Sequence, residues 1–204
     1  ASVDVAAPGV NIYSTVPVRQ TVWIDNFDDN DPFDWSTGGT NNTWGLTSSE
    51  SYSSSWSLAD SPAGNYQNDT DSWVISPVIN LSSYKGAKLE FKFKGTLEYE
   101  PDAKEYYDYI YVQVSTDLSN WTNQDIRIDG NINDGIYKPT DGDWKSASVD
   151  LGGFDGNSVV YIKFRFISDH SKTEEGFYFD DIAVIAVSES YDETEYKYKN
   201  GTSM

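Results

Sequence analysis

Apolar and polar side chains alternate strictly in three segments of this chain. In residues 88–94 the apolar positions are Leu89, Phe91 and Phe93, and charged residues stand between them. Because successive side chains of a β-strand point to opposite faces, this period of two predicts a strand with one buried face. The same pattern is found in residues 107–115 and 159–168. We therefore expect these three segments to be half-buried strands.

The rest of the sequence also favours strands over helices. The chain of 204 residues contains 15 Tyr, 9 Phe and 7 Trp, and aromatic side chains pack well on a pleated sheet. Asn, Asp, Gly and Pro separate the alternating segments as turns, and residues 177–187 read as a final strand. Strands that follow one another without a helical period predict an all-β chain, folded as an antiparallel jelly-roll β-sandwich.

The charge of the chain limits its partners. It has 33 acidic and 14 basic residues, which gives a formal net charge of −19 at pH 7. Because nucleic-acid binding depends on Lys and Arg at the phosphates, we exclude nucleic acid and anionic membranes as partners. Excess carboxylates instead keep a protein soluble or bind calcium. Without cysteines or a membrane-length apolar run, the chain is expected to be soluble, and its oligomeric state stays open.

The two ends of the chain carry two halves of one motif. The sequence VDVAAPGVNIYSTVP lies near the N-terminus, and NGTSM lies at the C-terminus. Together they resemble adjoining pieces of the subtilisin-like serine proteases, in which a strand ending in APG is soon followed by GTSM. The resemblance implies that Ser203 is the nucleophile and that its own amide helps to hold the oxyanion. It also implies that Asn200, Gly201 and Thr202 shape the approach to that serine.

This chain lacks the other parts of such an active site. In the family, the triad aspartate and histidine come before the segments found here. His170 lies in SDHSKTEEG and Asp4 lies in a predicted strand, and neither matches the family's segments. Because a serine hydroxyl without a general base is a poor nucleophile, we expect this chain alone to be inactive. Hydrolysis of polypeptide substrates would belong to the parent enzyme.

The middle of the chain resembles a different module. Its segments DNFDD, SLADSPAGNY, SWVISPVINLSS and FRFISDHSKTEEGFYFDDIAV are similar, in this order, to jelly-roll modules. These modules accompany secreted microbial metalloproteases of the immune inhibitor A type and some subtilisin-like proteases, and they are loosely similar to the MAM domain. We therefore assign residues 1–17 and 196–204 to remnants of the protease domain and its hairpin. We assign residues 18–195 to the inserted β-sandwich. The turn of the hairpin can hold such a module, because insertions succeed at exposed turns.

The resemblance to jelly-roll modules also implies a structural calcium ion between the first and last strands. Calcium binds six to eight oxygen atoms, including carboxylates and backbone carbonyls, so the sequence names only some of its ligands. The candidate ligands are Asp28, Asp29, Asp60, Asn65, Asp180 and Asp181.

Two functions from different classes follow. The main hypothesis is an accessory module of a secreted subtilisin-like serine endopeptidase, which guides large substrates or stabilises the enzyme through calcium. The alternative is a carbohydrate- or protein-binding module without a catalytic role, in which Tyr107, Tyr109 and Tyr111 form an aromatic platform. The same stripe of tyrosines is also typical of plain cross-strand packing. A simple spacer is a third hypothesis.

Overall fold

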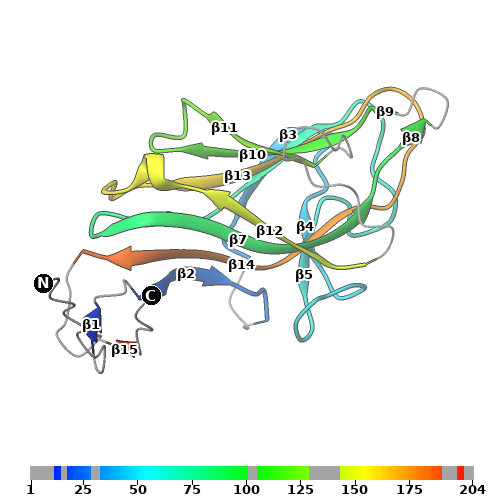
Figure 1. Ribbon diagram of the computed structural model, residues 1–204. Helices are drawn as coiled ribbons and strands as arrows, with labels where there is room; N and C mark the ends of the chain where they lie inside the picture. Colours follow the sequence, from blue (N-terminus) through cyan, green and yellow to red (C-terminus); the bar gives the residue numbers. More distant parts are fainter. Residues whose placement is uncertain are drawn as a thin grey trace, which may run out of the picture.

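The fold of the chain is known from a computed structural model. The structure describes residues 12–14, 18–28, 33–100, 105–128, 143–189 and 197–199. Two antiparallel β-sheets lie one above the other as the layers of a sandwich (Figure 1). The predicted all-β sandwich is confirmed. The described part of the chain contains one short 3-10 helix, η1 (Gly152–Phe154), outside the two sheets.

Five strands form the first sheet. Their order is β11 (Thr122–Ile128), β10 (Tyr109–Ser115), β13 (Tyr161–Ile167), β6 (Asp71–Ile75) and β3 (Ser36–Thr40). All neighbouring pairs are antiparallel. The strands predicted at residues 107–115 and 159–168 are therefore neighbours at the centre of one sheet.

The second sheet has six strands. Its order is β12 (Lys145–Asp150), β7 (Tyr84–Thr96), β14 (Gly176–Ser188), β5 (Ser57–Ala59) and β4 (Gly45–Thr47), and β2 (Arg19–Asp25) also pairs with β14. The two long central strands, β7 and β14, contain the segments predicted at residues 88–94 and 177–187. They lie side by side along the whole layer in Figure 1.

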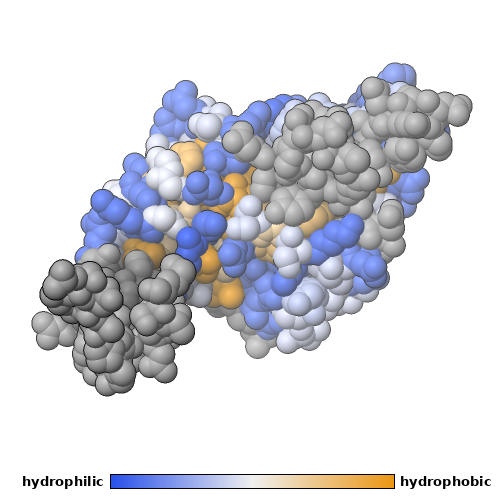
Figure 2. Space-filling model, viewed as in Figure 1, coloured by the Kyte–Doolittle hydropathy of each residue, from blue (hydrophilic) through white to orange (hydrophobic). Residues whose placement is uncertain are grey.

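The inner faces of both sheets meet in an aromatic core. Phe164 of the first sheet lies with its ring centroid 4.5 Å from that of Phe179 and 5.3 Å from that of Phe91, both on the second sheet. The side chains that the alternation predicted as apolar are buried in all three segments, including Leu89, Val112 and Phe164. Each fully buried side chain of this size contributes about 2–3 kcal/mol to folding. Figure 2 shows hydrophobic residues mainly in the middle of the visible side, with hydrophilic residues around them.

Two strands near the chain ends pair outside the sandwich. β1 (Ile12–Ser14) is antiparallel to β15 (Lys197–Lys199), with Tyr13 opposite Tyr198. This pair lies close to the end of the sandwich where β2 begins (Figure 1). At the opposite end, β8 (Tyr99–Glu100) and β9 (Glu105–Tyr106) form a small antiparallel pair. The proposed domain boundaries stay a prediction.

The remaining motif residues, Asp4, Asn200, Gly201, Thr202 and Ser203, lie outside the described residues. None of the described helices is long and apolar enough to span a membrane.

Candidate ligand-binding face

The outer face of the five-stranded sheet carries a row of aromatic and planar polar side chains. Trp73 of β6 stands opposite Arg165 of β13, and Arg165 stands opposite Tyr111 of β10. Their sequence neighbours Val74 and Phe164 are fully buried in the core. Because side chains alternate across a strand, the row points away from the core, and its three residues are half-buried.

Trp73 lies flat against the neighbouring strand because that strand has glycine at the contact. Gly38 of β3 pairs with Trp73, and a Cβ atom at residue 38 would lie 2.4 Å from Cζ2 of the indole. Any larger side chain there would push the indole away. Glycine is rare in strand interiors and marks places where another group approaches the backbone closely. The sheet thus holds an indole face parallel to its own surface.

Arg165 is held in place by a carboxylate on the same face. Its Nε and Nη2 donate to the two carboxylate oxygens of Asp71 at 2.7 Å and 2.6 Å. This hydrogen bond lowers the pKa of Asp71 and raises the pKa of Arg165. The paired geometry fixes the plane of the guanidinium, so that its remaining N–H groups can serve a ligand.

The predicted tyrosine stripe lies beside this row. The rings of Tyr109 and Tyr111 pack edge to face, with centroids 5.0 Å apart. Tyr107 precedes the strand and is 39% exposed. The structure therefore brings Tyr109 and Tyr111 to the face. The sequence analysis did not single out Trp73 and Arg165, although the alternation of DSWVI in residues 71–75 is a signal for an outward-facing tryptophan.

Three of the predicted calcium ligands lie around one loop. Asp28 accepts hydrogen bonds from the backbone N–H groups of Ser55 and Trp56 at 2.7 Å and 3.1 Å. Asp180 accepts from the backbone of residues 52–53 at 2.8 Å and 3.0 Å, and Asp181 accepts from a serine hydroxyl of the same loop at 2.8 Å. The three carboxylates thus contact the same loop, residues 52–56, from the two ends of the sandwich module.

The other predicted ligands lie elsewhere. Asp60 accepts a hydrogen bond from the backbone N–H of Phe177 through Oδ1, while its Oδ2 is buried without a partner. Burial raises the pKa of Asp60 to about 7, against the lowering effect of that hydrogen bond. Asn65 donates to the carbonyl of Thr173 at 2.9 Å. Asp29 lies outside the described residues.

The described candidate ligands do not gather their oxygen atoms around one point, as a calcium ion requires. Among the described residues, three carboxylate, imidazole or thiol ligand atoms converge within 4.8 Å at one place only, and it involves none of the six. Backbone N–H groups of the loop already partner the oxygens of Asp28 and Asp180, so an ion would have to use the remaining lone pairs. Calcium at the predicted residues stays a prediction.

The calcium prediction is tested by chelation. If calcium binds to the folded chain and not to the unfolded chain, it stabilises the folded state by mass action. Removal of the ion with EGTA should then lower the melting temperature. Asp181→Ala should reduce this effect, and Glu90→Ala, on the exposed face of β7, should leave it unchanged. An identical melting temperature with and without EGTA, together with no calcium by elemental analysis, would show that the ion is absent.

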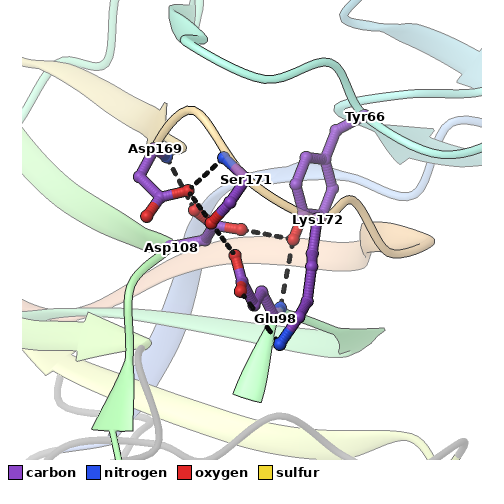
Figure 3. Close-up of polar contacts among 6 residues, drawn as sticks. All are labelled: Tyr66, Glu98, Asp108, Asp169, Ser171 and Lys172. Atoms are coloured by element: carbon purple, nitrogen blue, oxygen red, sulfur yellow. Dashed lines mark hydrogen bonds and ion pairs between the residues drawn. The ribbon is translucent and has the colours of Figure 1, made fainter. Parts of the chain in front are cut away.

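Among the described residues, the one place where three possible metal-ligand atoms lie close together is a buried cluster of carboxylates. The sequence did not reveal this cluster. Glu98, Asp108 and Asp169 come from three separate strand ends and meet near Tyr66 and Lys172 (Figure 3). The Tyr66 hydroxyl donates to Asp108, whose other oxygen accepts the backbone N–H of Asp169 at 2.9 Å. The Lys172 ammonium lies 3.6 Å from a Glu98 oxygen. Burial raises the pKa of Asp108 to about 6, although the hydrogen bond from Tyr66 lowers it.

Comparison with known proteins supports the fold and a distant sequence relationship. No family model matches the chain. Bacillopeptidase F of Bacillus subtilis (strain 168) is 27% identical over 158 residues, which are 75% of this chain and 10% of that protein. This chain therefore corresponds to about a tenth of that relative's length.

Two solved structures share the sandwich. The K1 cleaved adhesin domain of Lys-gingipain from Porphyromonas gingivalis W83 has a TM-score of 0.54 at 19% identity, over 79% of this chain and 96% of that domain. The CBM22-1 xylan-binding domain of Xyn10C from Paenibacillus barcinonensis has a TM-score of 0.51 at 10% identity, over 85% of this chain and 98% of that one. These chains show that the sequence folds as an antiparallel β-sandwich of the kind found in adhesin and carbohydrate-binding domains.

Proposed function

We propose that the chain is a non-catalytic carbohydrate-binding module and that the outer face of the five-stranded sheet is its binding surface. The observation that carries this proposal is the row of Trp73, Arg165 and Tyr111, with the indole lying flat on glycine and the guanidinium fixed by Asp71.

The chemistry of this row suits a sugar chain. One face of a pyranose ring is largely C–H and packs on a flat aromatic surface, while its hydroxyl groups need fixed donors and acceptors around that surface. Trp73 supplies the flat surface, and Arg165 supplies oriented N–H donors. Because both are held by neighbouring side chains or backbone before binding, little conformational entropy is lost when a ligand binds.

Two further observations support the proposal. The xylan-binding domain described above binds a polysaccharide, as its name states, and has the same fold. The net charge of −19 also agrees, because it opposes binding to the phosphates of nucleic acid.

The test is binding to a panel of soluble polysaccharides, including xylan and mixed-linked β-glucan, by affinity electrophoresis and calorimetry. For the bound members of the panel, Trp73→Ala should weaken binding at least tenfold, which corresponds to about 1.4 kcal/mol. Tyr52→Ala is the matched control, because Tyr52 is an exposed aromatic residue whose ring packs on Lys92 of the other sheet. Binding that is unchanged by Trp73→Ala, or absent for every polysaccharide, would contradict the proposal.

A second proposal concerns the longer protein. We infer that the module is carried, as an insertion, by a secreted subtilisin-like serine endopeptidase that acts on polypeptides through Ser203. The support is the distant match to Bacillopeptidase F, a peptidase by its name, and the pairing of β1 with β15 next to the two halves of the terminal motif. In that arrangement the module would bring the protease to a carbohydrate surface. The gene sequence on both sides of this segment tests the proposal: it should encode the triad aspartate and histidine before it and the rest of the nucleophile helix after it.

A further inference from the structure

A cavity opens at the edge of the sandwich beside β2, which pairs only with β14 among the described strands. Its volume is about 380 Å³, and every residue that lines it belongs to the described part of the chain. Binding sites for small molecules have volumes of roughly 300–1,000 Å³, so this edge cavity has room for a small sugar. Its walls include Val22, Trp23, Asn80, Ser82, Ser83 and Tyr84.

A β-bulge builds the aromatic wall of the edge cavity. Trp23 stands opposite Val184 of β14. Thr21 stands opposite the next residue, Ile185, so Val22 is an extra residue in β2. Consecutive side chains of a regular strand point to opposite faces, but here Val22 and Trp23 both pack against the core. Bulges re-aim side chains and are common next to binding sites, and this one brings an indole and an aliphatic side chain to the same cavity.

The opposite wall is a fixed turn with free polar groups. Oδ1 of Asn80 accepts a hydrogen bond from the backbone N–H of Ser82 at 2.9 Å. The carbonyl of Ser83 accepts one from the backbone N–H of Glu189 at 2.8 Å, which holds the turn against the end of β14. The amide nitrogen of Asn80 and the hydroxyl groups of Ser82 and Ser83 bond to no described residue. Because the turn is held in place before binding, these groups can serve a ligand at little cost in conformational entropy.

The lining of the edge cavity contains no charged side chain. Lys85, which follows the turn, is paired with Glu189 at 2.9 Å. A charged ligand would lose hydration in the cavity without gaining a counter-charge there, so the cavity favours a neutral ligand. The indole and aliphatic wall suits the C–H face of such a ligand, and the hydroxyl and amide groups opposite suit its own hydroxyl groups. A neutral pyranose ring has both.

We propose that the edge cavity is a second carbohydrate site, which takes a neutral pyranose with its C–H face on Trp23 and its hydroxyl groups on the turn at residues 80–83. For its ligand class, this inference rests on the proposed carbohydrate-binding function. The site itself lies elsewhere in the molecule. Trp23 shares the inner face of the second sheet with the fully buried Val184, whereas Trp73 lies on the outer face of the first sheet.

The test is a titration of the isotope-labelled protein with the methyl glycosides of xylose, glucose, galactose and N-acetylglucosamine, followed by nuclear magnetic resonance. At least one of these neutral glycosides should shift the indole N–H signal of Trp23 and the backbone signals of residues 82–83 in a saturable way. Methyl glucuronide, which carries a carboxylate on the same ring as the glucoside, should bind more weakly than the methyl glucoside.

Two variants locate the binding. Ser83→Leu fills the edge cavity from an exposed position and should weaken glycoside binding at least about tenfold. Trp23→Phe removes the indole N–H but keeps an aromatic ring beside Trp35, and it should also weaken binding, measured at residues 82–83. Ser48→Leu is the matched control, because Ser48 is an exposed serine that does not line the cavity, and it should leave binding unchanged.

The outcomes separate this inference from the proposed function. No shift with any glycoside, or binding that survives unchanged in a folded Ser83→Leu variant, overturns the edge cavity as a site and leaves polysaccharide binding at the outer face intact. Glycoside binding should persist in Trp73→Ala, and its loss there would place the glycoside on the outer face instead. Glycoside binding at the cavity without any polysaccharide binding would contradict the proposed face and leave this inference standing. A melting curve of each variant shows that any loss of binding occurs in a folded protein.

Discussion

Between roughly pH 5 and roughly pH 8, the free energy of unfolding is expected to fall by about 4 kcal/mol. The cause is two buried carboxyl groups, Asp60 and Asp108, whose pKa values in the folded chain are about 7 and about 6, against an ordinary value of 3.8. Below the ordinary value both groups are protonated whether the chain is folded or unfolded. As the pH rises, the unfolded chain loses these protons first, and the folded chain must then hold charges that burial disfavours. Burial raises the pKa of Asp180 too, which acts in the same direction.

Single substitutions should divide this pH dependence into two parts. Asp60→Asn should remove the whole decline between about pH 6 and about pH 7 and roughly half of the decline below pH 6, because its contribution accumulates between the ordinary value and its pKa of about 7. Asp108→Asn should reduce only the decline below about pH 6, because the contribution of this group is complete above its pKa. Glu90→Gln, an exposed change on β7, should leave the whole curve unchanged. Urea unfolding at a series of pH values, in EGTA so that no metal occupies Asp60, measures each curve. Stability that rises from pH 5 to pH 8 would contradict this account of both carboxyl groups.

Alanine at residue 95 should prevent stable folding or cost more than about 4 kcal/mol. Gly95 of β7 lies opposite Phe177 of β14. A Cβ atom there would lie 2.1 Å from the carbonyl oxygen of Gly176 and 2.9 Å from Cα of Phe177. Both atoms belong to backbone, so no rotation of a side chain can relieve the clash, and the two strands would have to separate.

The matched control for this substitution is Gly153→Ala. A Cβ atom at Gly153 would meet no atom within 4 Å, and its backbone does not need the left-handed conformation that favours glycine. The urea midpoint, followed by tryptophan fluorescence, should fall sharply or vanish for Gly95→Ala and stay within the error for Gly153→Ala. Equal midpoints for the two variants would mean that β7 and β14 are not packed as the structure has them.

The long strands could be predicted from the sequence because their signal is local. The alternation of residues 88–94 and 159–168 places apolar side chains on one face, and these segments are found within β7 and β13 with that face buried. The short strand β3, with the sequence STGGT, has no such signal. It is a strand through its pairing with β6, in which Gly38 stands opposite Trp73, and this is a contact between residues far apart in the sequence.

The candidate site was predictable only in part for the same reason. Tyr109 and Tyr111 share a face of one alternating segment, so the sequence alone placed them together. Trp73 and Arg165 reach that face from other strands, and their register with β10 depends on the pairing of the whole sheet.

Mapping the contact surface of a bound polysaccharide tests the central claim most directly. Hydroxyl-radical footprinting with mass spectrometry measures the oxidation of individual aromatic side chains with and without ligand. Carbohydrate binding at the outer face of the five-stranded sheet predicts strong protection of Trp73 and Tyr111 and no change at Tyr52, which lies against the other sheet. Protection of Tyr52 with unchanged oxidation of Trp73 and Tyr111 would place the ligand on the opposite side and contradict the assignment.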